Sequence, residues 1–165
     1  MSFQKQVNAN QALGNVGQIS KAHHSFLNVI PAIAADDFVK VGSFVQSSST
    51  ATNENEVVGA SGKQITGSIL GVVVRDSLKV AGDSTPTLEV KKGENCAILT
   101  EGSIFIEVVN VQAAKGKYVF LKDADGSLGF FDTTTENQYT YTGFRVSKGH
   151  DTTSAGLIEI STARA

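Results

Sequence analysis

The sequence predicts an all-β protein: a small antiparallel β-barrel or sandwich with an extended N-terminal arm. First, residues 87–131 contain stretches in which apolar and polar side chains alternate, as in Ser103–Val108. This period of two is typical of half-buried strands. Second, turns rich in glycine, asparagine and aspartate separate these stretches. Third, only 18% of residues are charged, which fits a β protein whose surface is partly covered by neighbours.

The length of 165 residues suits one domain that can bury a substantial core. We assign residues 1–20 to the arm and residues 21–165 to a single barrel-like domain. Gly14 and Gly17 would interrupt a helix in the arm, which carries scattered apolar residues. One interpretation of the arm is a frayed terminus. The other is a segment that orders on a partner by adding a strand to its sheet. The second interpretation makes a partner interface of Phe3, Val7, Leu13, Val16 and Ile19.

Along the body, the apolar run 26–30 is ended by Pro31, and residues 36–37 open a turn. Residues 38–45 form a strand in which Gly42 marks a bulge or a close backbone approach. Residues 46–55 are wholly polar and predict an exposed hairpin loop or insertion. Further strands are expected at 65–74, 103–108, 117–122, 138–147 and 157–162. A short turn at 123–126 and a polar loop at 132–137 separate the later strands.

Composition excludes several classes of protein. The formal net charge of −2 argues against nucleic acid as a direct partner, because phosphate binding needs clustered lysine and arginine. The single cysteine, Cys96, cannot form an internal disulfide, and its apolar surroundings indicate a small buried hydrophobe. No run of eighteen apolar residues and no signal-like N-terminus exist, so we expect no membrane contact and synthesis in a cytosol.

Motifs for chemistry are weak. His23 and His24 are adjacent, and adjacent strand residues point to opposite faces, so they do not suit one metal ion. Asp123 and Asp125 resemble the start of a calcium loop, but its bidentate glutamate is missing. The segment ending at Lys63 lacks the remaining features of a phosphate-binding loop. Nothing marks Glu101 and Glu107 as a catalytic pair. We therefore predict that the protein has no catalytic residue, no metal ion and no cofactor, and that it is not an enzyme.

Taken together, the arm and the central segments resemble the structural cement, or capsid decoration, proteins of tailed bacteriophages. The resemblance is carried in order by residues 11–20, 34–45, 69–75, 90–94, 101–108, 114–121, 125–126 and 157–161. The chain departs from the common pattern at Gly17-Gln18, where the family has Gly-Asp, and in its polar insertions at 46–55 and 132–137.

The resemblance implies a β-barrel body on the outer surface of an icosahedral phage head, made in the cytoplasm of a bacterial host. It implies binding to the major capsid protein at subunit junctions, stabilisation against internal DNA pressure, and self-association as a dimer or trimer. The alternatives are another virion part, such as a head-fibre base or tail-tube subunit, or a small ligand-binding barrel.

Overall fold

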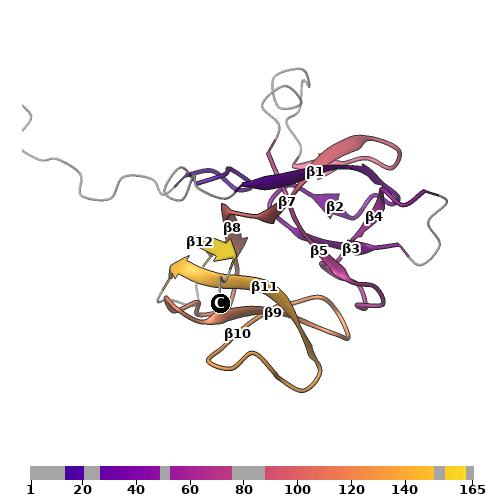
Figure 1. Ribbon diagram of the computed structural model, residues 1–165. Coiled ribbons are helices and arrows are strands. Elements are labelled where there is room, and N and C mark those ends of the chain that lie inside the picture. Colours follow the sequence, from indigo (N-terminus) through magenta and orange to yellow (C-terminus); the bar gives the residue numbers. More distant parts are fainter. Residues whose placement is uncertain (1–13, 21–26, 49–52, 76–87, 151–154, 163–165) are drawn as a thin grey trace, which may run out of the picture.

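The computed structural model describes residues 14–20, 27–48, 53–75, 88–150 and 155–162 (Figure 1). Within these ranges the chain forms twelve strands and no helix, which confirms the predicted all-β fold. The strands belong to a closed barrel, a five-stranded sheet and a small two-stranded sheet. In Figure 1 the five-stranded sheet lies below the barrel, and the chain passes from one to the other between β7 and β8.

The barrel closes in the order β1-β4-β3-β5-β7. Its strands are β1 (Asn28–Ala34), β3 (Phe44–Ser47), β4 (Glu56–Gly59), β5 (Ile69–Val73) and β7 (Asn95–Glu101). All neighbours are antiparallel except β1 and β4, which pair in parallel through Ile33 and Ala34. The short strands β2 (Val39–Lys40) and β6 (Glu89–Val90) pair with each other. Their buried residues Val39 and Val90 pack with the apolar residues inside the barrel.

The second sheet has the order β10-β9-β11-β12-β8 and is antiparallel throughout. It contains β8 (Ser103–Val108), β9 (Tyr118–Lys122), β10 (Leu128–Phe131), β11 (Tyr139–Lys148) and β12 (Gly156–Thr162). The predicted strands at 103–108 and 117–122 are therefore confirmed, as is the turn at 123–126, which joins β9 to β10. Only Gly102 separates β7 of the barrel from β8 of the sheet.

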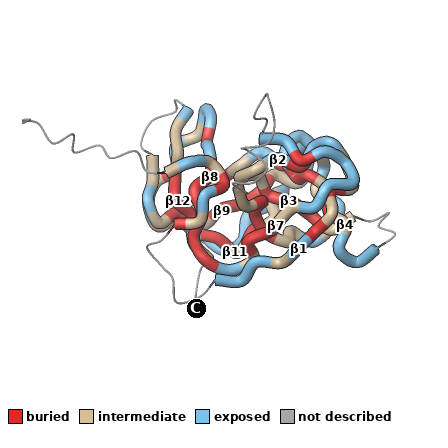
Figure 2. The backbone as a smooth tube through the Cα atoms, turned by 90° about the horizontal axis from the view of Figure 1, so that it is seen from above, coloured by how far each residue is buried: buried red, intermediate tan, exposed pale blue. Residues whose placement is uncertain are grey.

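One apolar core joins the barrel to the sheet. Phe44, Val72 and Leu99 from the barrel pack with residues from the inner face of the sheet, including Ile104 and Phe144. The rings of Phe44 and Phe144 meet edge to face, with centroids 5.7 Å apart. Figure 2 shows buried residues along β3 and β7 as well as along β8, β11 and β12. Because these contacts cross between the two sheets, neither side buries its apolar face alone.

The prediction of one strand over residues 38–45 is wrong. The chain turns at residues 41–43, and the two halves become β2 and β3. Gly42 has φ of 75°, and a Cβ there would lie 2.3 Å from Cγ1 of Val16. The close backbone approach predicted at Gly42 is thus confirmed, and the segment that approaches is the arm.

The prediction that Pro31 ends its apolar run is also wrong. Pro31 lies inside β1, opposite Ala97 of β7. The pairing of β1 with β4 begins only at Ile33, so no neighbour there requires an N–H from Pro31.

Gln46, predicted to begin an exposed loop, is instead 1% exposed and lies in β3. Its Nε2 donates to the carbonyl of Gln64 at 3.0 Å, and its Oε1 accepts from the backbone N–H groups of Thr66 and Gly67 at 2.8 and 3.0 Å. The side chain therefore holds the irregular segment before β5 against the barrel.

We expect Gln46→Ala to lower the free energy of unfolding by about 2–4 kcal/mol, because three backbone groups lose their partner. Gln46→Leu, which nearly keeps the volume, is expected to cost a similar amount. Urea denaturation measures both. Gln64→Ala is the matched control, because Gln64 is exposed and its carbonyl remains. Equal stability of the Gln46 and Gln64 variants would contradict the assigned role.

Candidate functional site

In the part of the chain that the structure describes, no group of three or more histidine, cysteine, aspartate or glutamate residues could hold a metal ion. His23 and His24 lie outside the described residues. His150 exchanges two backbone hydrogen bonds with Ala113, at 2.9 and 3.0 Å, beside the sheet. Cys96 is half-buried and packs against the apolar interior of the barrel.

The acidic residues at 123–126 build the turn between β9 and β10. Oδ1 of Asp125 accepts hydrogen bonds from the hydroxyl and the backbone N–H of Ser127, at 2.7 and 3.0 Å. These two hydrogen bonds hold the pKa of Asp125 below its usual value, and the bond from the Ser127 hydroxyl has the larger effect. Oδ1 of Asp123 accepts from the hydroxyl of Thr140 at 2.7 Å. Both carboxylates thus have structural partners.

Lys63, at the end of the segment tested as a phosphate loop, forms an ion pair with Asp36 and lies 4.2 Å from the ring centroid of Phe38. Oδ1 of Asp36 also accepts from the backbone N–H groups of Phe38 and Gly59. The lysine therefore fastens the turn after β1 to the loop after β4. Phe38 nevertheless remains 50% exposed.

The described end of the arm, residues 14–20, docks on the body beside the outer strand β8. The N–H of Gly17 donates to the carbonyl of Phe105 at 2.8 Å, and the N–H of Phe105 donates to the carbonyl of Gln18 at 3.0 Å. The N–H of Ser20 donates to the carbonyl of Ser103 at 2.8 Å. This antiparallel pairing covers the backbone groups of a sheet edge. We call residues 14–20 the anchor segment.

Contacts with the barrel side of the molecule also hold the anchor segment. The N–H of Arg75, just beyond β5, donates to the carbonyl of Gly17 at 2.8 Å. A Cβ on Gly17, whose φ is 73°, would lie 2.3 Å from Cγ1 of Val41. Gly14 lies against the ring of Phe105, which explains why Phe105 is 5% exposed on the face of β8 away from the barrel. The anchor segment is thus held by both the barrel and the sheet.

Two of the five residues predicted to form a partner interface lie in the described part of the chain, and three do not. Val16 and Ile19 lie in the anchor segment and are half-buried; Ile19 packs against the core between barrel and sheet. Phe3, Val7 and Leu13 lie outside the described residues.

Aromatic side chains gather on the outer face of the second sheet. They are Tyr118, Phe120, Phe131, Tyr139 and Tyr141, which include all three tyrosines of the sequence. Neighbouring ring centroids lie 4.9–5.6 Å apart. The pKa of Tyr141 is raised, mainly by burial and to a smaller extent by the nearby Tyr118. All except Phe120 are only half-buried, so these rings remain partly accessible to solvent.

Comparison with known proteins identifies the family. A family model described as structural cement protein (E217 gp24/Pam3 gp6) matches residues 3–163. The chain belongs to this family. Its members are structural proteins of phages, so this cement protein is a structural component of a phage virion.

A solved structure shares the fold of this cement protein. A chain described as "The capsid of Myoviridae Phage XM1" matches with a TM-score of 0.59 and 16% identity, over 98% of this chain and 97% of that chain. The head fiber gp8.5 N base in bacteriophage phi29 matches with a TM-score of 0.47 and 11% identity, over 85% of this chain and 97% of that chain. This TM-score is too low to carry an argument. No curated protein matches the sequence. In its described residues the cement protein has no helix long and apolar enough to cross a membrane.

Sequence reasoning missed the anchor segment and the aromatic face. The two glycines of the arm, interpreted only as helix breakers, mark its contact with the body, as does Gly42. The aromatic face was visible in part, because Tyr139 and Tyr141 alternate along one strand. Its other members come from β9 and β10, and only the register of three strands brings them together.

Proposed function

We propose that this protein is a capsid decoration protein that binds the outer surface of an icosahedral phage head at junctions between major capsid protein subunits. Bound there, it stabilises the head against the pressure of packaged DNA. The observation that carries the proposal is the family match over residues 3–163. The anchored arm supports it, because an anchor at 14–20 leaves residues 1–13 to reach a neighbouring subunit.

A shell under outward pressure fails where its subunits meet, so a clamp must hold at least two of them. In this proposal the rigid body contacts one subunit, and the arm contacts another through Phe3, Val7 and Leu13. A standard protein interface buries about 800 Å² on each partner. Two linked contacts of moderate affinity release together far more rarely than either does alone. Self-association as a dimer or trimer would multiply the contacts in the same way.

The test uses the purified full-length protein and phage heads that lack it. We expect the protein to co-sediment with these heads to saturation, and the decorated heads to release their DNA at a higher temperature than the undecorated ones. Cryo-electron microscopy of the decorated heads should show density over the subunit junctions. Binding absent at micromolar protein, or rings and tubes formed by the protein alone, would contradict the proposal and favour another virion part.

A further inference from the structure

In the described part of the chain, three side-chain oxygens are buried without a hydrogen bond, and all three lie on the second sheet. Two are the carboxylate oxygens of Glu159 on β12, which is 1% exposed. The third is Oγ of Ser103 on β8, whose backbone carbonyl accepts the N–H of Ser20 from the anchor segment. Buried polar groups in native proteins are nearly always hydrogen-bonded, so this cluster needs a physical explanation.

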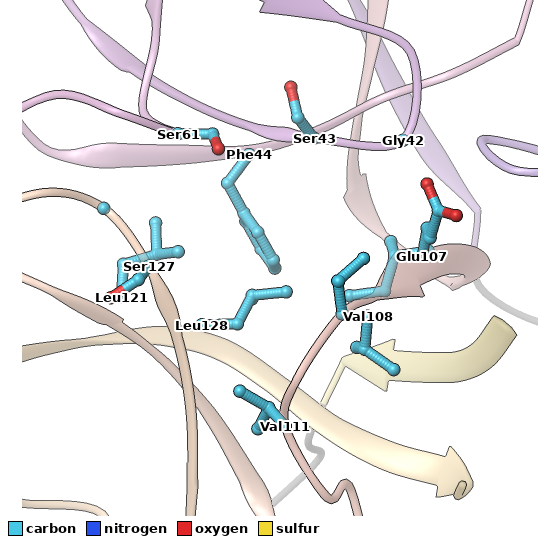
Figure 3. Close-up of a pocket in the computed structure, with 13 residues that line it drawn as sticks. Gly42, Ser43, Phe44, Ser61, Glu107, Val108, Val111, Leu121, Ser127 and Leu128 are labelled. Atoms are coloured by element: carbon cyan, nitrogen blue, oxygen red, sulfur yellow. The ribbon is translucent and has the colours of Figure 1, made fainter. Parts of the chain in front are cut away.

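Glu159 lies beside the ring that the anchor segment covers. The pairing of β12 with β8 places it opposite Phe105, on the face of the sheet away from the barrel. Figure 3 shows the same alternation further along β8, where Val108 points into an apolar cavity between barrel and sheet and Glu107 turns away from it. Gly14 lies against the ring of Phe105. Opening of the anchor segment would therefore uncover this part of the outer face.

Lys148 of β11 supplies the charge that neutralises Glu159. Its Nζ lies 3.1 Å from Oε2 of Glu159, without the alignment of a hydrogen bond, and its side chain is 53% exposed. Arg145 on the same strand donates instead to the carbonyl of Gly116. A buried carboxylate that loses its counter-charge is strongly destabilised. The burial of Glu159 thus depends on a cation that solvent can reach.

We propose that the Lys148–Glu159 pair controls the docking of the anchor segment. While Lys148 neutralises Glu159, residues 14–20 stay on the body. When Lys148 no longer does so, the carboxylate is stable only in water, and the anchor segment opens to admit it. An opened segment adds about 23 Å of extended chain to the arm, at about 3.3 Å per residue. The use of this reach on a neighbouring subunit rests on the proposed function, whereas the coupling of the pair to docking does not.

Hydrogen exchange of the full-length protein, followed by NMR, measures the docking. Four backbone amides report it, because their hydrogen bonds join the anchor segment to the body; they belong to Gly17, Ser20, Arg75 and Phe105. Two amides with hydrogen bonds elsewhere serve as references, Ile33 in the barrel and Lys122 in the second sheet. Local opening of the anchor segment speeds exchange at the four reporters alone, whereas global unfolding speeds it everywhere.

Two variants change the charges in opposite ways. Lys148→Met removes the charge and keeps most of the alkyl stem, and it is expected to speed exchange at the four reporters about tenfold or more. Glu159→Gln removes the buried charge and keeps the shape, and it is expected to slow exchange there several-fold. Lys117→Met is the matched control, because Lys117 pairs on the same sheet with Asp132, which is 80% exposed. This control should leave the reporters unchanged.

The double variant separates the charge of Lys148 from its packing. With Glu159→Gln in place there is no buried charge to neutralise, so the addition of Lys148→Met should change exchange at the reporters by less than about twofold. An equal acceleration by Lys148→Met in both backgrounds would show that its stem only packs on the sheet, and would overturn the inference. Reference amides that accelerate by the same factor as the reporters would overturn it too.

The test is independent of the proposed function, because it uses the protein alone. Coupled exchange in a protein that fails to bind heads would overturn the proposed function and support the control of docking by the pair. Wild-type binding to heads, together with reporters that do not respond to Lys148→Met or Glu159→Gln, would overturn this inference and leave the proposed function standing.

Discussion

Removing residues 2–13 is expected to lower the apparent affinity for undecorated heads by about 10²–10⁴-fold, while the body stays folded. The loss has this size because one of two linked attachments disappears, and with it the high effective concentration of the other. The anchor segment remains in place, since its hydrogen bonds to Ser103 and Phe105 of β8 and to Arg75 use only backbone groups of residues 17–20. Co-sedimentation over a range of protein concentrations measures the change.

A variant of full length separates the chemistry of the arm from its length. Replacing Phe3, Val7 and Leu13 together by serine should weaken binding nearly as much as the truncation. The matched control replaces three polar residues of the arm by serine and should leave binding unchanged; these residues are Gln4, Asn8 and Gln11. Removal of residues 2–20 should also lower the melting temperature, because it uncovers the edge of β8. Full binding by the protein without residues 2–13 would refute the assignment of the arm as a capsid contact.

The strands that could be predicted from the sequence are those whose alternation of apolar and polar residues follows from packing one face of a sheet. Ile104, Ile106 and Val108 alternate because β8 packs one face on the barrel, and all three are buried. The same pattern predicts the other face to be exposed, yet Phe105 is buried under the anchor segment. That contact joins residues about ninety positions apart in the chain, so no local period can contain it.

The remaining errors have a common physical origin in tertiary contacts. Residues 38–45 have the composition of a strand, but the chain turns at Gly42 because the arm packs there. Gln46 has the sequence context of a polar loop, but its amide replaces missing backbone partners of the segment before β5.

Phe144→Ala is expected to lower the free energy of unfolding by about 3–5 kcal/mol, which is a large part of the roughly 5–15 kcal/mol typical of native proteins. Phe144 is 1% exposed, and its ring meets Phe44 across the junction of sheet and barrel. Its removal leaves a cavity in the core that both sheets share. At about 2–4 °C for each kcal/mol, the melting temperature should fall by about 6–20 °C.

The way in which this variant unfolds tests whether barrel and sheet form one cooperative unit. If the shared core joins them, urea denaturation should give one transition with an unchanged slope, shifted to lower urea. Phe131→Ala is the control, because Phe131 is only half-buried on the outer face of the sheet and should cost about 1–2 kcal/mol. Two separate transitions, or a cost for Phe144→Ala no larger than that for Phe131→Ala, would show that the barrel is stable without the sheet. In that case the rigid clamp proposed for the capsid surface would lose its physical basis, because force applied to the arm would separate the barrel from the sheet before it reached the capsid contact.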